Sequence, residues 1–274
     1  MRTHSLLLIN PRSGDRRGDD SPSAEQVADA ARKLGVVPHL LEKGEDPGDL
    51  ARQSGAEIVG IAGGDGSLAA VAAAAIDLDA AFVCVPVGTR NHFARDIGLD
   101  RADPLAALAA FTAGIERRVD VGRVGERLFV NNVSLGVYAR LVHRREHRRR
   151  RGEALARLRA LGVVARHRHA LHASVNDEPV RARVIFVGNN RYELSLFTVG
   201  EREQLSEGEL CLWTAAGWLP SAWDERAGPS FRIETGGARV RAAIDGEPAV
   251  LESPFELESL PGALRLLLPP RGED

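Results

Sequence analysis

The sequence predicts a two-domain protein, in which an α/β domain is followed by a mainly antiparallel β-sandwich. Two observations lead to this fold class. Strand and helix patterns alternate through about residue 118, which is the βαβ rhythm of a parallel sheet. After Glu116 the pattern changes to short strands separated by turn residues, which is typical of a sandwich. The 274 residues are enough for two cores. We therefore expect domains at residues 1–118 and 119–274, with the extreme C-terminus packing back on the first domain.

The expected elements follow from apolar runs and from the turn residues that end them. In the first domain, short apolar strands end in polar loops that contain glycine, and the last helix ends at a glycine. These strands lie at 6–9, 37–41, 57–62 and 81–85, and the helices lie at 24–34, 49–54, 68–76 and 104–114. The strands of the second domain are expected at 118–124, 127–133, 171–176, 180–187, 208–214, 230–235, 239–245 and 264–268.

The segment Gly63-Gly64-Asp65-Gly66-Ser67 lies between an expected strand and an alanine-rich helix, and it is typical of a phosphate-binding turn. Its glycines allow unusual backbone conformations and close approach to an oxyanion, and the following helix offers free N–H groups. Asp65 would repel phosphate unless a divalent cation lay between them, so it indicates a magnesium nucleotide. The alternative for this segment alone is a tight turn with a solvated aspartate.

Two further strands end in loops of the same character. The first strand runs into Asn10-Pro11-Arg12-Ser13-Gly14, and the strand at 81–85 runs into a loop that contains Gly88, Thr89 and Asn91. Ligands bind at the carboxyl ends of parallel strands, so we expect these loops to face the same crevice as the glycine turn.

The three loops resemble the nucleotide-binding motifs of the diacylglycerol kinase and sphingosine kinase superfamily, NPxSG, GGDGT and PxGTxNxFA. The resemblance covers about the first half of the chain, with weaker matches beyond it. It implies a phosphofructokinase-like nucleotide domain, a C-terminal sandwich that binds substrate, and ATP with Mg²⁺. It also implies transfer of phosphate to a hydroxyl of a diacylglycerol-like lipid. Ser67 replaces the usual threonine and keeps the hydroxyl.

Asp245-Gly246-Glu247 is the second chemical candidate, because a carboxylate within hydrogen-bond reach can take the proton of an acceptor hydroxyl. On a strand the two acids would share one face. The segment resembles the DGE element of the family, which carries the catalytic base. The resemblance therefore implies that either Asp245 or Glu247 is the base. A surface turn with solvated acids is the alternative. Glu207 stands where relatives hold a structural magnesium through an aspartate, and an ordinary glycine turn is the favoured interpretation there.

Two nearby groups of amides resemble family elements close to the substrate. Asn131, Asn132 and Ser134 follow one strand, and Asn189 and Asn190 end another. Amides of this kind suit either the binding of substrate hydroxyls or the satisfaction of buried strand ends.

The composition excludes several classes of protein. A net charge of −2 argues against a whole-surface nucleic-acid binder, and two cysteines argue against a disulfide framework. The sequence shows neither a secretory signal nor an apolar window of membrane-spanning length, which predicts a cytoplasmic protein. The arginine run Arg144 to Arg151 favours either peripheral contact with an anionic membrane at its inner face or a solvated helical face, with nucleic acid the least favoured partner.

Two other functions remain open at this stage. Related glycine turns occur in NAD kinases, so a soluble acceptor is the first. Glu42, whose charge would disfavour nearby phosphate, and the altered turn at Glu207 suggest a nonenzymatic nucleotide-binding regulator as the second. The sequence also leaves a homodimer open.

Overall fold

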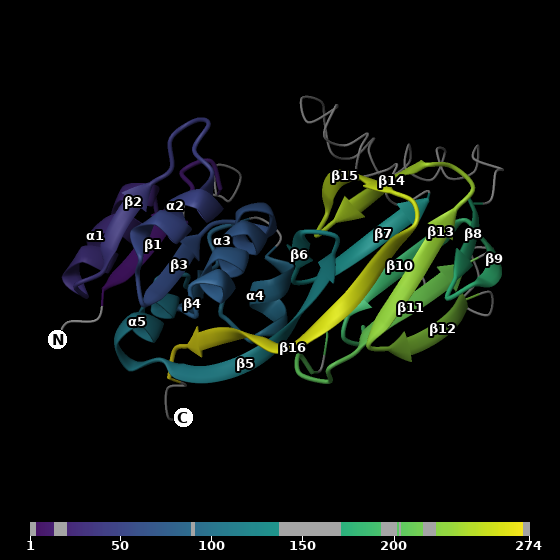
Figure 1. Cartoon of the computed structure of the whole chain (residues 1–274). Helices are drawn as coiled ribbons and strands as arrows, with labels where there is room; N and C mark the ends of the chain where they lie inside the picture. The colour runs from purple at the N-terminus through teal and green to yellow at the C-terminus, as the bar shows by residue number, and fades with distance from the viewer. Residues whose placement is uncertain are drawn as a thin grey trace. The chain divides into compact units, whose positions relative to one another are not determined.

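The computed structural model describes residues 4–13, 21–88, 91–136, 171–192, 202, 204–215 and 223–270. The chain divides into two compact units, Met1–Val121 with Pro261–Asp274, and Gly122–Leu260. Strands β5 (Ile115–Val124) and β16 (Phe255–Leu268) have residues in both units (Figure 1). The predicted fold class is confirmed, because the first unit holds a parallel sheet and the second holds antiparallel strands. The units divide after residue 121 rather than after residue 118, and residues 261–274 belong to the first unit.

The first unit is built on a sheet of strand order β2-β1-β3-β4-β16. Strands β2, β1, β3 and β4 are parallel, and their register brings the ends of three of them together, because Ile9 pairs with Ala62 and Ala62 pairs with Val85. This confirms that three polar loops leave the same edge of the sheet. The bounds are β1 (Ser5–Ile9), β2 (Val37–Leu40), β3 (Ile58–Ala62) and β4 (Ala81–Val85).

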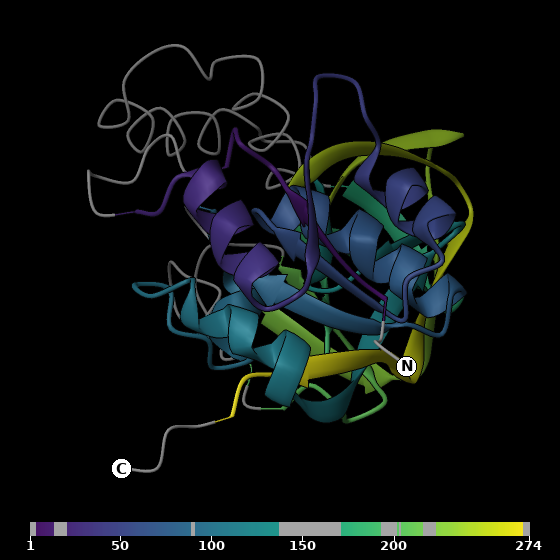
Figure 2. The same cartoon turned by 90° about the vertical axis from the view of Figure 1, so that its left-hand side faces the viewer.

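Helices cover both faces of this sheet (Figure 2). On one face, α1 and the η1–α5 segment pack on alternate strand residues such as Leu7 and Val83, and on the other face α3 packs on β3 and β4 beside α2. The helix bounds are α1 (Ala24–Lys33), α2 (Pro47–Ser54), α3 (Asp65–Asp77), α4 (His92–Asp96), the 3₁₀ helix η1 (Ala106–Ala109) and α5 (Ala110–Ala113).

The first two helices begin where local sequence provides a cap. Ser23 and Gln26 form a capping box at α1, with the Gln26 N–H donating to Ser23 Oγ at 3.2 Å and the Ser23 N–H donating to Gln26 Oε1 at 2.7 Å. Asp46 caps α2, whose first residue is Pro47 and whose end is marked by Gly55 in the left-handed conformation. Local side chains therefore cap the N-termini of both α1 and α2.

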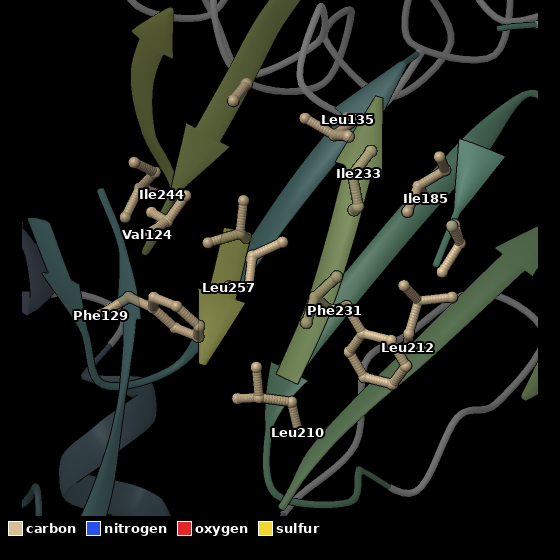
Figure 3. Packing of buried hydrophobic residues seen from close by; sticks show 14 of the residues in the cluster. Val124, Phe129, Leu135, Ile185, Leu210, Leu212, Phe231, Ile233, Ile244 and Leu257 are labelled. Atoms are coloured by element: carbon tan, nitrogen blue, oxygen red, sulfur yellow. The ribbon is translucent and has the colours of Figure 1, made fainter. Parts of the chain in front are cut away.

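The second unit contains the antiparallel sheet β12-β11-β10-β7-β14-β15 and the strand order β16-β13-β8-β9. Buried apolar residues from both groups of strands form its core, including Phe129, Leu135, Ile185 and Phe231 (Figure 3). The remaining strands are β6 (Arg127–Phe129), β7 (Asn132–Gly136), β8 (Leu171–Val175), β9 (Glu178–Ala182), β10 (Val184–Asn189), β11 (Leu210–Ala215), β12 (Trp223–Gly228), β13 (Ser230–Thr235), β14 (Arg239–Ile244) and β15 (Glu247–Glu252).

Several element boundaries differ from the sequence expectation. The strands expected at 127–133 and 180–187 are each two strands, and the expected helix at 104–114 is a 3₁₀ turn followed by four α-helical residues. Within the described part of the chain, no helix is both long and apolar enough to cross a membrane. The arginine run Arg144 to Arg151, Gly14 and Thr89 lie outside the described residues.

Candidate nucleotide and acceptor sites

The edge of the first unit's sheet positions the predicted nucleotide loops. The N–H of Asn10 donates to the Ala62 carbonyl at 2.9 Å, and the N–H of Gly63 donates to the Val85 carbonyl at 3.3 Å. Each loop therefore continues the register of the sheet for one more residue. The helix that follows β3 begins at Asp65, directly after Gly64, and no side chain caps it. Its first N–H groups and the positive end of its dipole thus face the edge from which the loops leave.

Close packing, rather than an unusual backbone, explains two of the glycines at this edge. Neither Gly63 nor Gly64 has a positive φ, in contrast to our expectation of conformations forbidden to other residues. A Cβ at Gly63 would collide with Ser67 Oγ, and a Cβ at Gly88 would lie 2.5 Å from the Gly64 Cα. A Cβ at Gly64 itself would have its nearest neighbour at 3.8 Å. Gly88 therefore lies directly against the glycine turn, whereas a Cβ at Gly64 would make only an ordinary van der Waals contact.

Asp65 links the glycine turn to the loop after β4. Its carboxylate accepts the N–H of His92 at 3.3 Å and the N–H of Phe93 at 3.4 Å, at the start of α4. The side chain is half-buried, so the solvated aspartate of the alternative interpretation does not describe it. Asp65 consequently caps a helix 27 residues away, and its charge adds to burial in raising the pKa of the Cys84 thiol.

Asn91 holds the loop after β4 in shape. It adopts the left-handed conformation with φ 45°, it is buried, and its Nδ2 donates to the Gly88 carbonyl at 2.7 Å. Asparagine is among the few residues other than glycine that adopt this conformation readily. The side chain is therefore engaged within its own loop.

The loop after β1 is a turn closed by Asn10, whose Oδ1 accepts the N–H of Arg12 at 3.1 Å and whose carbonyl accepts the N–H of Ser13 at 3.0 Å. The guanidinium of Arg12 reaches the Glu42 carbonyl at 3.4 Å, and the Glu42 side chain is exposed. The N–H of Glu42 donates to Glu45 at 2.8 Å, and this bond, followed by the hydrogen bond with His39, lowers the pKa of Glu45.

The Asp245 turn lies in the second unit and closes the hairpin of β14 and β15. Asp245 and Gly246 have φ angles of 48° and 80°, and Ile244 pairs with Glu247, which defines a two-residue turn of the type that favours Asp-Gly. The expectation that Asp245 and Glu247 share one face of a strand is therefore wrong, because the turn separates them. Glu247 is the first residue of β15 and is exposed.

The carboxylate of Asp245 anchors this turn to the segment between β6 and β7. It accepts the N–H of Val130 and of Asn131, each at 2.8 Å, and the N–H of Asn132 at 2.9 Å. Asp245 is thus an ordered carboxylate rather than a solvated surface acid. Of the predicted acceptor-site residues, the structure fixes Asp245 and leaves Glu247 on the surface.

Comparisons with known proteins concern the family and the fold of the chain. Residues 4–124 match the family model of the diacylglycerol kinase catalytic domain. The chain therefore carries, almost entirely within its first unit, a domain of the diacylglycerol kinase catalytic family. It is similar to the probable lipid kinase YegS-like of Klebsiella pneumoniae (strain 342), with 27% identity over 97% of this chain and 96% of the relative. It is also similar to the probable lipid kinase YegS of Salmonella arizonae, with 28% identity over the same shares of the two chains.

Solved structures share the fold of the chain. A putative diacylglycerol kinase from Bacillus anthracis str. Sterne superposes with a TM-score of 0.73 at 17% identity, covering 98% of this chain and 99% of that chain. A second structure, of a diacylglycerol kinase from the same organism, gives a TM-score of 0.69 at 15% identity and covers 98% of both chains. At these identities the similarity concerns the fold.

The residues at the edge of the first unit's sheet fit a magnesium ion that arrives with a nucleotide. Mg²⁺ is commonly held by one or two carboxylates together with substrate phosphates and water. Asp65 provides one half-buried carboxylate beside an open helix N-terminus, and its two hydrogen bonds to backbone are long. Among the described residues, no group of three His, Cys, Asp or Glu side chains forms a separate metal cluster.

Glu207, at the predicted metal turn, forms hydrogen bonds with other residues of the chain. Its Oε2 accepts the N–H of Arg191 at 3.3 Å, its own N–H donates to Asn190 Oδ1 at 3.2 Å, and Gly208 follows with φ 74°. These bonds form an ordinary glycine turn. A magnesium ion at Glu207 stays a prediction.

Sequence reasoning missed Arg202, a buried arginine of the second unit that bonds to the segment anchored by Asp245. The residues on either side, Glu201 and Glu203, give the sequence the pattern of a solvated charged loop. Local sequence carried no signal for it, because its partners are 13 to 72 positions away. The amides of Asn131 and Asn189 are buried in the same place, where Asn131 Oδ1 accepts from Arg202 and Asn189 Nδ2 donates to the Val130 carbonyl.

Proposed function

We propose that the protein is an ATP-dependent lipid kinase that transfers the γ-phosphate to a hydroxyl of a diacylglycerol-like lipid. The observation that carries this proposal is the register of three strand-end loops beside the uncapped N-terminus of α3. An edge of this kind binds the phosphates of a nucleotide through backbone N–H groups. The lipid acceptor is supported by the two similar bacterial proteins described above, which are named probable lipid kinases.

The loops of the first unit would bind ATP. The N–H groups of Gly64 and of the first turn of α3 would face the phosphates, while the packing of Gly88 on Gly64 sets the distance between two of the loops. Bound with ATP, Mg²⁺ neutralises charge that develops on the transferred phosphate, and Asp65 would hold it directly or through water. The nucleotide loops comprise Asn10, Pro11, Arg12, Ser13, Gly14, Gly63, Gly64, Asp65, Gly66, Ser67, Gly88, Thr89 and Asn91.

The Asp245–Glu247 turn would activate the acceptor. The lipid hydroxyl oxygen forms a bond to the γ-phosphorus as the bond to the leaving ADP oxygen breaks, and a carboxylate takes the hydroxyl proton. Asp245 is rigid but three backbone donors occupy its oxygens, whereas Glu247 is exposed and keeps a longer side chain. Both residues are retained as candidates, and separate variants distinguish them.

Transfer of labelled γ-phosphate from ATP and Mg²⁺ into a total lipid extract tests this function. We expect a labelled lipid with the wild type, and loss of about 100-fold or more with Asp65→Asn, a size comparable to the removal of one electrostatic contact in an active site. Glu252→Gln is the matched control for Glu247→Gln, because Glu252 is an exposed acid at the other end of β15.

The outcomes separate the other candidate functions. Labelling of NAD in place of lipid would assign a soluble acceptor. Tight ATP binding without transfer to any lipid in the extract or to NAD would assign a regulator and overturn the kinase proposal. Full activity of Asp65→Asn would remove Asp65 from the mechanism.

A further inference from the structure

The segment between β6 and β7 is held from both sides of its backbone. On one side its three N–H groups donate to Asp245, and the N–H of Asp245 returns a bond to the Asn132 carbonyl at 2.8 Å. On the other side, Asn189 contributes its N–H to the Asn131 carbonyl at 2.9 Å and its Nδ2 to the Val130 carbonyl at 3.3 Å. Every backbone polar group of residues 130–132 is therefore accounted for, as buried segments require.

Arg202 completes this arrangement. Its side chain is buried, with Nη1 donating to the Val130 carbonyl at 2.6 Å and to the Asn189 carbonyl at 3.0 Å. Nη2 donates to Asn131 Oδ1 at 3.0 Å, and the guanidinium lies 5.1 Å from the centre of the Tyr192 ring. One planar group thus binds two strand ends and one side chain, which the single ammonium of a lysine cannot reproduce.

We propose that Arg202 is a positioning residue for the Asp245–Glu247 turn. Arg202 fixes residues 130–132, these residues fix the Asp245 carboxylate through three N–H groups, and Asp245 fixes the turn that presents Glu247. The claim about position is independent of catalysis, and the consequence for rate rests on the proposed function. Arg202 makes no direct contribution to proton transfer in this scheme.

An effect of Arg202 on the position of the turn should change kcat but not the KM for ATP. Because the nucleotide loops belong to the first unit, Arg202→Lys should lower kcat and leave the KM for ATP unchanged. A misplacement of a reacting group by about 1 Å costs up to about 100-fold in rate, so we expect a decrease of about 10- to 100-fold.

Amide hydrogen exchange tests the position directly. In Arg202→Lys the amides of residues 130–132 and of Asp245 should exchange at least about tenfold faster, since the exchange rate rises in proportion to the equilibrium constant for local opening. The control is Arg226→Lys, which makes the same change at an arginine on β12 that pairs with Asp224 and Glu178. It should leave these amides unchanged. Equal acceleration throughout the second unit, or no acceleration at these amides, would overturn the proposal.

A double-mutant comparison tests the route to the carboxylate. If Arg202 acts through the turn, Arg202→Lys should have little further effect on kcat in a Glu247→Gln background. Full additivity would contradict action through Glu247. If the wild type transfers no phosphate, the proposed function fails and the exchange measurement alone decides the position of the turn. Should Arg202→Lys fail to fold, Asn131→Ala removes one acceptor of the guanidinium and should give the same exchange pattern at smaller amplitude.

Discussion

The glycines at the nucleotide edge differ in how much room they leave for a larger side chain. A Cβ at Gly88 would collide with the Gly64 backbone, whereas a Cβ at Gly64 would make an ordinary van der Waals contact. We predict that Gly88→Ala costs about 1–3 kcal/mol in the free energy of unfolding, because backbone must shift to admit the methyl group. Gly64→Ala should change that free energy by less than about 1 kcal/mol, because its φ of −101° is ordinary for alanine. Denaturant unfolding of both variants measures the difference, and equal losses would contradict it.

The two acids of the hairpin should respond differently to the loss of charge. In Asp245→Asn the new amide directs a donor at one of three N–H groups, so we predict a loss of about 1–3 kcal/mol in the free energy of unfolding. Glu247→Gln alters an exposed side chain and should stay within about 0.5 kcal/mol. Thermal unfolding followed by circular dichroism measures both.

These stabilities also decide how activity data on the pair are interpreted. Loss of transfer in a stable Glu247→Gln protein would assign the base to Glu247. Full activity there, with loss in Asp245→Asn beyond the fraction unfolded, would assign it to Asp245. An unchanged stability of Asp245→Asn would contradict the anchoring role of its carboxylate.

The loop after β2 carries the clearest pH dependence among the elements of the first unit. Hydrogen bonds from the Glu42 N–H and from His39 lower the pKa of Glu45. A carboxyl group whose pKa is lower in the folded state adds stability above its unfolded pKa, and this stability disappears as the pH falls through the lowered value. We therefore predict that Glu45→Gln lowers Tm at pH 7 and that this difference disappears in acid, below the ordinary value of 4.5.

Glu42→Gln is the control for this loop, because its side chain is exposed and its backbone N–H remains. Its Tm should follow that of the wild type across the same pH range. A difference between Glu45→Gln and wild type that grows in acid would reverse the sign of the argument and exclude the proposed hydrogen bonds as its cause.

Elements with strong local signals were predictable, and those that depend on distant partners were not. The strand-end loops at Asn10, Gly63 and Gly88 were predictable because each follows an apolar run and contains glycine or asparagine. The hairpin at Asp245 was mistaken for strand although Asp-Gly is a strong turn signal. The contacts of Arg202 were beyond prediction, because hydrogen bonds between residues remote in sequence leave no local pattern.

At the scale of the whole molecule, the last strand illustrates the same limit. The sequence predicted a strand only at residues 264–268, and the Pro261 and Gly262 that precede it are residue types typical of a break in a strand. The structure has one strand of 14 residues, β16, in which Gly262 adopts φ 59° and its N–H donates to Asp120 at 2.7 Å. The positive φ of a glycine keeps the strand continuous where another residue would be strained. The strand consequently serves both units.

The first unit is incomplete without the last residues of the chain. Leu264 and Leu266 are fully buried, Leu266 pairs with Phe82, and Arg265 donates to the Asp79 carbonyl at 2.6 Å and to Glu116 at 2.9 Å. A chain that ends at residue 260 would expose Phe82 at an open strand edge. We predict that it loses ATP binding and that Leu266→Ala costs about 2–5 kcal/mol in the free energy of unfolding.

Val250→Ala is the control, because this side chain is 58% exposed and its loss should cost less than about 0.5 kcal/mol. Isothermal titration with ATP and denaturant unfolding measure the two effects. A truncated chain with the ATP affinity of the wild type would show that residues 1–121 fold without β16. In that case β16 would contact the first unit without stabilising the loops that bind phosphate.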